Sequence, residues 1–483
     1  MRRLAAFFAL AVFAQQPEAG LNPTVKQIVD AISEDRIAAT LKKLEGFGTR
    51  YILSPQDDPA HGIGAAKRWI HDQFVSYSPR LQVSYQDFSI KRGARRGQVI
   101  RDVDLSNIIA VLPGTTQKDR YVLVTAHYDS LDQVWKPYTG DDQTIAEAAR
   151  QGIDADEERR YLKVLPRDRD QGPLDFEATA SAAAPGVTDD GSGTAAVMEL
   201  ARVMSAYQFD KTIVFVAFAA EEVGLSGSQV YAAQAKHDHM QIEAVLNNDI
   251  IGSDVSGNGR SSTNVLRVFS ASPDDSAPRE LARYTKQIAE RYVPSMQVQM
   301  VFRADRFLRG GDHTPFVNEG FPAVRLTSAS ENFDNQHTLT DTLANTSVSY
   351  AIRAARMNAA VLASLALAPA PPVLNWTWAS GPNKGGHVPL LTRGKSGYDA
   401  VLHWQPNTEP DLAGYAVLVR STTSPVWERE TWVGNVTSYT LPDVSIDDIV
   451  IGVKAVDREG NQSMVSCYTE PVLPSQLTPA ERK

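Results

Sequence analysis

The chain has 483 residues, 43% of them hydrophobic, which is enough for about two domains with full cores. Its 57 acidic residues outnumber its 48 basic residues, and the formal net charge is −9 at pH 7. That balance argues against nucleic acid or an anionic membrane as a partner. The single Cys467 excludes an intramolecular disulfide framework, and we expect it to be a buried apolar residue.

The N-terminal segment, residues 1–14, is expected to be a short signal peptide. Arg2 and Arg3 precede an apolar core at residues 4–14 whose end suits cleavage. This core is too short for an ordinary transmembrane helix, and no other apolar stretch reaches about 18 residues. The sequence therefore predicts a secreted or periplasmic protein without a transmembrane segment.

Helical periodicity follows this segment. Residues 25–45 are predicted as one helix and residues 64–77 as a second. Strand and helix patterns then alternate through residues 107–365, which indicates an α/β domain with a mostly parallel central sheet flanked by helices. We expect one face of the first helix to be buried, with Ile28, Ile32, Ile37, Leu41 and Leu44 on it.

Two adjacent carboxylates, Glu221 and Glu222, follow the apolar strand-like run at residues 212–218. Such a pair at the end of a buried strand is costly to desolvate unless a positive group lies beside it. Neighbouring residues point in different directions, so one carboxylate can bind a cation while the other handles a proton. On its own a Glu pair is weak evidence, because most such pairs are solvated.

Other metal-type residues are placed in the same way, at the ends of predicted elements. Because strand carboxyl ends of an open α/β sheet meet at one crevice, ligands scattered along the chain can converge there. Each residue alone has an ordinary structural explanation, as a buried histidine, a helix cap or a loop residue. The set of imidazoles and carboxylates suits borderline divalent metals such as zinc. Its members are His127, Asp189, Glu222, Asp249 and His337.

These segments resemble the secreted bacterial leucine aminopeptidase family, the co-catalytic di-zinc peptidases that also include glutamate carboxypeptidases. The family pattern runs H-x-D, D-D/N-G/A-S-G, E-E, an Asp at a strand end and H-T-x-x-D, and all five elements occur here in order. The resemblance spans roughly residues 30–365. Residues 106–114 and 311–316 also resemble flanking family segments.

The resemblance and the chemistry imply the same roles. Asp189 has two carboxylate oxygens and can bridge two zinc ions, or other divalent metals. The resemblance implies that His127 and Asp249 complete the shell of one ion, and that Glu222 and His337 complete the other. Glu221 is then free to act as the general base that activates water.

Supporting groups are also expected around these ligands. Asp129 lies two residues beyond His127 on the same strand face, so we expect it to orient the imidazole. Asp341 has the same expected role for His337.

Two departures from the family pattern stand out. Gln336 occupies a position where family members often have Tyr, which weakens the implication of an oxyanion or substrate contact there but not of the metal site. His127 and Asp189 are also much farther apart than usual, so residues 131–185 are an insertion. Because both of its ends adjoin predicted ligands, the insertion must begin and end at the rim of the site. We hypothesise that it partly covers the site and favours short peptides; a surface excursion without a role is the alternative.

A Pro-rich linker at residues 368–373 is expected to separate the catalytic domain, residues 25–367, from a C-terminal domain at residues 374–476. The C-terminal pattern of short strands and turns is typical of a β-sandwich and resembles a fibronectin type III domain. No chemistry is evident there. The strands are expected at residues 398–404, 414–420, 431–433, 438–441 and 449–456.

Several other residues are of types that can bind metal or substrate but do not belong to the family motif. His237 and His239 resemble a metal motif but lie in a polar stretch, so a surface position is favoured. His313 is expected to support the site rather than bind metal. Arg309 is equally consistent with contacting substrate and with pairing with a neighbouring acid.

The sequence thus predicts a secreted zinc aminopeptidase that removes N-terminal residues from peptides, with a monomer as the expected state. A carboxypeptidase of the glutamate carboxypeptidase type is an alternative, because Arg303, Arg306 and Arg309 could bind a terminal carboxylate. A glutaminyl cyclase on the same fold is another, although its relatives tend to lose the D-D-G-S-G element that is intact here. A non-catalytic binding protein, as in transferrin receptors, would normally lose ligands.

Overall fold

The computed structural model describes residues 20–94, 98–137, 146, 171–306, 309–378 and 387–468. The predicted signal peptide and much of the predicted insertion lie outside these ranges. The chain forms two compact units. Residues 23–367 form the first, and residues 368 onward form the second together with the segment that ends at Asn22. Asn22 donates a side-chain hydrogen bond to Asn461 of that second unit, at 3.0 Å.

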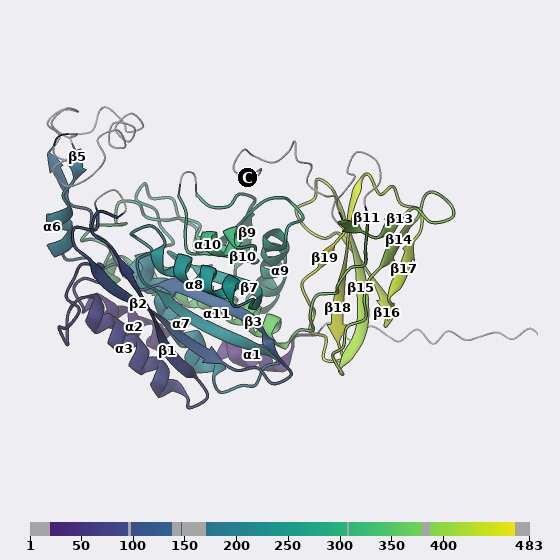
Figure 1. Ribbon diagram of the computed structural model, residues 1–483, viewed down its shortest axis with the longest axis horizontal. Coiled ribbons are helices and arrows are strands. Elements are labelled where there is room, and N and C mark those ends of the chain that lie inside the picture. Colours follow the sequence, from purple (N-terminus) through teal and green to yellow (C-terminus); the bar gives the residue numbers. More distant parts are fainter. Residues whose placement is uncertain are drawn as a thin grey trace, which may run out of the picture. The chain divides into compact units, whose positions relative to one another are not determined.

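The first unit is built on an eight-stranded sheet with the order β1-β2-β6-β3-β7-β10-β8-β9 (Figure 1). Its four central strands, β6, β3, β7 and β10, run parallel, and β8 and β9 are parallel to each other. Antiparallel pairing joins β1 to β2, β2 to β6 and β10 to β8. The strands are β1 (Gln82–Ile90), β2 (Val103–Leu112), β3 (Gln117–His127), β6 (Lys211–Phe218), β7 (Gln241–Asn248), β8 (Val265–Ser270), β9 (Gln297–Val301) and β10 (Ala323–Ser328).

Helices flank this sheet, which confirms the predicted fold class. Side chains alternate across a strand, so Leu123 and Val214 pack with α8 and α10 while their neighbours face the opposite side, where α7 and α11 contact the sheet. Because helices cover both faces, β6 and β10 are buried along their whole length and β3 is buried from Val122 onward. The helices are α1 (Pro23–Asp30), α2 (Glu34–Glu45), α3 (Gly62–Tyr77), α7 (Ser192–Met204), α8 (Ser226–His237), α9 (Ala277–Tyr292), α10 (His313–Asn318) and α11 (Val348–Leu367), with short turns η1 (Val187–Gly191) and η2 (Leu343–Asn345).

The helix predicted over residues 25–45 is wrong in one respect, because two helices, α1 and α2, occupy the segment. Ser33 stands between them in an extended conformation, and its side chain accepts a hydrogen bond from the backbone N–H of Arg36. This is an N-cap, followed by Glu34 and Asp35 in the first turn, where the helix dipole favours acidic groups. The apolar face is as expected, since all five residues predicted to lie on it are buried.

Part of the insertion is described. A short hairpin pairs β4 (Trp135–Pro137) with β5 (Gln171–Leu174), and α6 (Phe176–Ser181) follows it. The buried Phe176 packs against Ile100 and Leu174. Just before the hairpin, the carbonyl oxygen of Val134 accepts a hydrogen bond from the backbone N–H of Asp175 at 2.7 Å.

The second unit contains antiparallel sheets of three and four strands, β13-β14-β17 and β16-β15-β18-β19, and a two-stranded sheet, β11-β12. Residues from the three- and four-stranded sheets share one core around Trp404 and Tyr415, whose rings contact edge to face with centroids 5.4 Å apart. Cys467 is half-buried rather than buried. The strands are β11 (Trp376–Trp378), β12 (His387–Pro389), β13 (Leu391–Thr392), β14 (Ala400–His403), β15 (Leu412–Ser421), β16 (Arg429–Gly434), β17 (Ser438–Leu441), β18 (Ile449–Asp457) and β19 (Ser466–Cys467).

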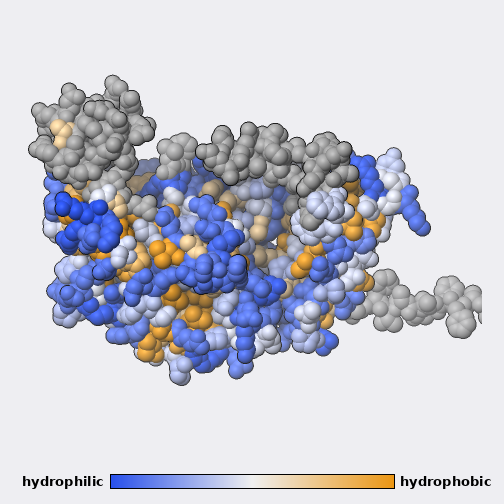
Figure 2. All heavy atoms as spheres, in the orientation of Figure 1, coloured by the Kyte–Doolittle hydropathy of each residue, from blue (hydrophilic) through white to orange (hydrophobic). Residues whose placement is uncertain are grey.

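Hydrophilic residues cover most of the described surface on the face shown in Figure 2, with smaller hydrophobic groups between them. Among the helices of the described residues, none combines the length and the apolar character that a bilayer-spanning segment requires.

Candidate metal centre and catalytic site

The site lies where the central parallel strands end. His127 is the last residue of β3, Glu221 and Glu222 follow β6, and Asp249 follows β7. Because these strands are parallel neighbours in register, their carboxyl ends share one edge of the sheet. Asp189 approaches the same edge in the turn η1 that precedes α7. The predicted residues therefore converge although they come from distant parts of the sequence.

The carboxylate of Asp189 lies between two imidazoles. Its Oδ1 is 3.2 Å from Nε2 of His127, and its Oδ2 is 3.3 Å from Nε2 of His337. Oε2 of Glu222 is 2.9 Å from the same His337 nitrogen. A carboxylate that presents one oxygen to each of two histidines has the arrangement that a bridging ligand between two cations needs.

Two groups of ligand atoms are close enough to hold a metal ion. His127, Asp189 and Glu222 form one, and His127, Glu221 and Asp249 form the other, each with its ligand atoms within 4.8 Å of one another. Nε2 of His127 and Oε1 of Glu222 are buried without a hydrogen bond of ordinary geometry. Buried polar atoms are normally satisfied, and imidazole nitrogen and carboxylate oxygen are ligands that zinc prefers. The residues present thus fit divalent metal ions.

Asp129 connects the strand that carries His127 to the glutamate pair. Its carboxylate accepts hydrogen bonds from the backbone N–H groups of Glu221, at 3.1 Å, and Glu222, at 3.3 Å. Its Oδ1 also lies 3.5 Å from Nδ1 of His127, and its backbone carbonyl lies 3.1 Å from the same nitrogen. The expected contact with His127 is present. The structure adds a second role that the sequence spacing did not suggest, since Asp129 also holds the backbone of Glu221 and Glu222. Ala220, just before the pair, has a positive φ of 61°, so the backbone is strained where it turns into the site.

The backbone around Asp189 is held by Asp341. The Asp341 carboxylate accepts hydrogen bonds from the N–H groups of Thr188, at 2.8 Å, and Asp189, at 3.0 Å. We expected Asp341 to orient His337; in the structure its carboxylate holds the backbone of Thr188 and Asp189. Gln336 also contacts Asp189, because its amide Nε2 donates to Oδ2 at 2.7 Å.

The buried charges of the site perturb one another strongly. Burial raises the pKa of Glu221 well above its usual value, His127 opposes this rise, and Asp249 adds to it. Burial lowers the pKa of His337, but Glu222 and Asp189 outweigh this effect and raise the pKa to about 10. Burial would raise the pKa of Asp189, yet its contacts with His127 and His337 hold it well below the usual value. The cluster has an excess of carboxylates, so it favours cations.

Sequence reasoning missed two buried arginines. Arg50 donates to the carbonyl oxygens of Tyr128, at 2.7 Å, and Gly186, at 2.6 Å, so it connects the loops that carry His127 and Asp189. Arg325, in the middle of β10, lies 2.8 Å from Oδ1 of Asp249 through its Nη2. An arginine flanked by apolar residues in a strand pattern is the signal that could have revealed Arg325.

The histidines and the arginine that do not fit the family motif lie outside the cluster of predicted ligands. His237 and His239 are exposed, as predicted. His313 is buried and donates from Nε2 to the carbonyl oxygen of Ala304 at 2.7 Å. Arg309 is exposed, and its Nη1 donates to Oε1 of Gln336 at 3.2 Å.

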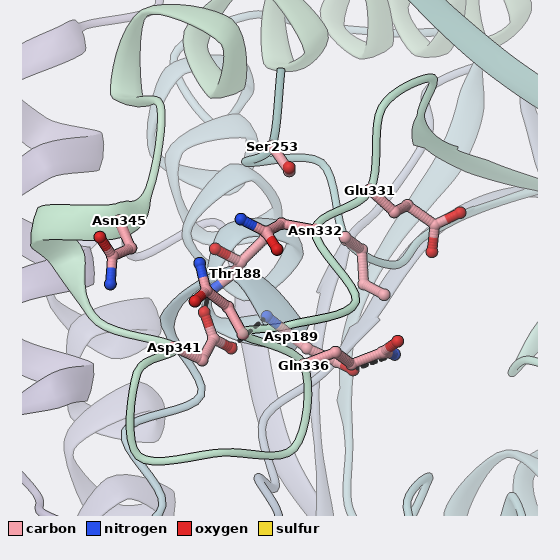
Figure 3. Close-up of a pocket in the computed structure, with 10 residues that line it drawn as sticks. Thr188, Asp189, Ser253, Glu331, Asn332, Gln336, Asp341 and Asn345 are labelled. Atoms are coloured by element: carbon pink, nitrogen blue, oxygen red, sulfur yellow. Dashed lines mark hydrogen bonds between the residues drawn. The ribbon is translucent and has the colours of Figure 1, made fainter. Parts of the chain in front are cut away.

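A polar pocket adjoins Asp189 (Figure 3). Gln336 lies on its wall beside Asp189, while Asn332 comes from the loop before His337 and Asn345 from η2 after it. The full lining is Thr188, Asp189, Ile250, Ser253, Glu331, Asn332, Asn335, Gln336, Asp341 and Asn345. The fold and the site together define a metal-dependent hydrolase.

Comparison with known proteins gives the family. The model of peptidase family M28 matches residues 107–362, more than half of the chain. A probable zinc metalloprotease of Leptosphaeria maculans is 31% identical over 470 residues, which cover 91% of this chain and 95% of that protein. Another from Pyricularia oryzae is 32% identical over 489 residues, covering 94% of this chain and 85% of that protein. The chain belongs to peptidase family M28 and is a zinc metallopeptidase.

The fold agrees with this assignment. The LapA aminopeptidase of Legionella pneumophila aligns with a TM-score of 0.50 and 20% identity, covering 74% of this chain and 78% of that one. At this identity the likeness concerns the fold alone.

Proposed function

We propose that this zinc metallopeptidase is an aminopeptidase that holds two divalent ions. In this assignment Asp189 bridges the ions, His127 and Asp249 complete one shell, and Glu222 and His337 complete the other. The observation that carries the proposal is the position of the Asp189 carboxylate, with one oxygen 3.2 Å from His127 and the other 3.3 Å from His337.

When bound, the two ions would polarise the scissile carbonyl and lower the pKa of the attacking water. Glu221 takes the proton of that water and delivers it to the departing amine. Burial supports this role, because it raises the pKa of Glu221 above its usual value and so strengthens the carboxylate as a base. Asp129 holds the backbone of Glu221 and so fixes the base relative to His127.

The excess of carboxylates around the ions favours a substrate that brings a positive charge. The α-ammonium of a free N-terminus supplies one, whereas an acyl-capped N-terminus does not. Glu221 and Asp249 are candidate partners for this ammonium. The polar pocket beside Asp189 is then a candidate subsite for the N-terminal side chain.

A panel of aminoacyl reporter substrates, assayed with and without a chelator, tests the proposal. Free aminoacyl substrates should be hydrolysed, their acyl-capped counterparts should not, and chelation should abolish the activity. Elemental analysis of the active protein should give two ions per chain. Hydrolysis confined to capped peptides with a free C-terminus would refute the aminopeptidase assignment, and a single ion would refute the two-ion site.

A carboxypeptidase of the glutamate carboxypeptidase type is the second candidate. Arg309 favours it, because this exposed guanidinium lies beside Gln336, one residue from His337. A terminal carboxylate in the site could pair with it. The capped substrates of the same panel separate this candidate from the first.

We also propose that residues 1–14 direct export and that the second unit is a fibronectin type III-like sandwich. The charge and apolar pattern of the N-terminal segment support the first, and the two antiparallel sheets around one core support the second. N-terminal sequencing of the protein recovered outside the cell should begin after residue 14. An intact Met1 on exported protein would contradict the signal peptide.

A further inference from the structure

Arg325 is a charged residue in a strand, β10, that is buried along its whole length. All six residues of β10 are buried, and Arg325 is fully so. The strand lies between β7 and β8, with Arg325 opposite Asn247 on one side and Phe269 on the other. A buried guanidinium is costly to desolvate, and a purely structural ion pair rarely offsets that penalty. Residues that break local rules in this way are expected at functional sites.

The guanidinium of Arg325 lies between two buried carboxylates. Its Nη2 is 2.8 Å from Oδ1 of Asp249, and its Nη1 is 3.2 Å from Oδ2 of Asp305. Nη1 also donates to the carbonyl oxygen of Gly310 at 3.0 Å. Asp305 and the carbonyl oxygen of Gly310 therefore hold Arg325 in place independently of Asp249. Because Arg325 is fixed in this way, it can in turn fix the position of the Asp249 carboxylate.

The loop that covers Arg325 is fitted closely to this arrangement. At Gly311, a Cβ atom would lie 2.9 Å from Nη1 of Arg325, 3.2 Å from Oδ2 of Asp305 and 3.3 Å from Oδ2 of Asp249. Only glycine leaves the three groups in place. The ion pair of Arg325 is with Oδ1 of Asp249, so Oδ2 of the same carboxylate can serve a cation.

From this geometry we infer that Arg325 is a positioning residue for Asp249, and that it governs binding of one of the two metal ions selectively. The inference rests on the two-ion site of the proposed function. Asp249 and His127 belong to one ion in that assignment, whereas Glu222 and His337, which hold the other, have no described contact with Arg325. The full burial of Arg325 keeps it from touching a substrate, so its effect passes through Asp249.

Zinc titration against a chromogenic chelator measures this effect directly. In Arg325→Met the site that contains Asp249 should lose about 10–100-fold in zinc affinity, as is usual when the partner of a metal ligand is removed. The other site should change by less than about twofold. Arg325→Lys keeps a positive charge but loses the forked contact, so its loss should be intermediate.

The matched control is Arg267→Met. Arg267 lies half-buried on the neighbouring strand β8, and its Nη2 pairs with the buried Glu331 at 2.7 Å. Glu331 also pairs with Arg306. Arg267 contacts neither Asp249 nor Asp305 among the described ion pairs, so both zinc affinities should stay at their original values.

Two background variants identify the affected ion. Glu222→Gln weakens binding of the ion that Glu222 holds together with His337. Adding Arg325→Met to this variant should remove the other ion, which Asp249 holds. In Asp249→Asn the same addition should leave the remaining ion unchanged. If Arg325→Met fails to fold, Asp305→Asn and Gly311→Ala provide the same test, because each disturbs Arg325 or Asp249 from the other side.

The outcomes are separable. A folded Arg325→Met with both original zinc affinities, or with equal losses at both sites, overturns the inference while leaving the proposed function intact. A wild-type protein that binds a single ion overturns the two-ion proposal itself. Zinc affinities altered in Arg267→Met as strongly as in Arg325→Met would show a general effect of buried charge and also overturn the inference.

Discussion

Replacement of Asp129 by asparagine should impair catalysis while leaving the site largely able to bind metal. The Asp129 carboxylate accepts the N–H groups of Glu221 and Glu222 at 3.1 and 3.3 Å. An asparagine keeps one oxygen and places an NH₂ group where the second oxygen was, so that NH₂ faces a backbone donor. One of the two hydrogen bonds is therefore lost, and the backbone that carries the general base must shift.

The magnitude follows from the bond that is lost. A hydrogen bond to a charged group contributes about 1.5–3 kcal/mol. If this energy is what holds Glu221 in its productive position, kcat should fall by about 10–100-fold, since 1.36 kcal/mol corresponds to a factor of ten. The KM of a small aminoacyl substrate should change little, because Asp129 is fully buried and cannot contact the substrate.

Steady-state kinetics on a reporter substrate, with elemental analysis of the same preparation, provides the assay. Asp104→Asn is the control, because Asp104 lies exposed on β2 and pairs through its carboxylate with Ser89. An unchanged kcat in metal-replete Asp129→Asn would refute this reasoning. Loss of an ion together with activity would show instead that the contact with His127 dominates.

Three further outcomes are expected. Glu221→Gln should keep both ions and lose about 10²–10⁴-fold in kcat, whereas Glu222→Gln should lower the metal content as well; elemental analysis that shows the reverse would exchange the two roles. Burial raises the pKa of Asp312 from 3.8 to about 7, with His127 opposing the rise and Asp129 adding to it. Because this folded-state pKa lies above the unfolded value, the stabilisation is complete below about pH 4 and is lost as the pH rises through 7. Asp312 should thus lower the unfolding free energy of the chelated protein by at most about 4 kcal/mol over this window, and Asp312→Asn should remove this contribution from the profile measured by denaturant titration. A chain ending at Leu367 should hydrolyse small aminoacyl substrates with near-native kcat, because every proposed ligand precedes that residue; inactivity of the folded truncation would show that the second unit contributes to the site.

The fold of the first unit was predictable because its signals are local. Apolar runs of strand length, such as residues 212–218, alternate with helical patterns, and a buried parallel sheet requires this pattern. The break between α1 and α2 was missed because the apolar spacing continues across it. Ser33, followed by acidic residues, is the local signal that outweighed the spacing.

The convergence of the candidate ligands was also predictable, since each lies at an element end on a known edge of the sheet. Their supporting contacts were not. Asp341 reaches the backbone of Asp189 only because the loop after His337 folds back over η1. Arg325 meets Asp249 because β10 pairs with β7, and strand order cannot be read from spacing. Such contacts depend on tertiary packing rather than on neighbouring residues.

The surplus of buried carboxylates around Asp189 makes the stability of the fold depend on the supply of metal ions. Without cations, these groups repel one another in a medium of low dielectric constant, so folding and metal uptake are coupled. Ions that bind only the folded chain stabilise it in proportion to the logarithm of their free concentration. The melting temperature of a preparation should therefore report its metal loading, and a host short of zinc would hold this chain in a form more open to proteolysis.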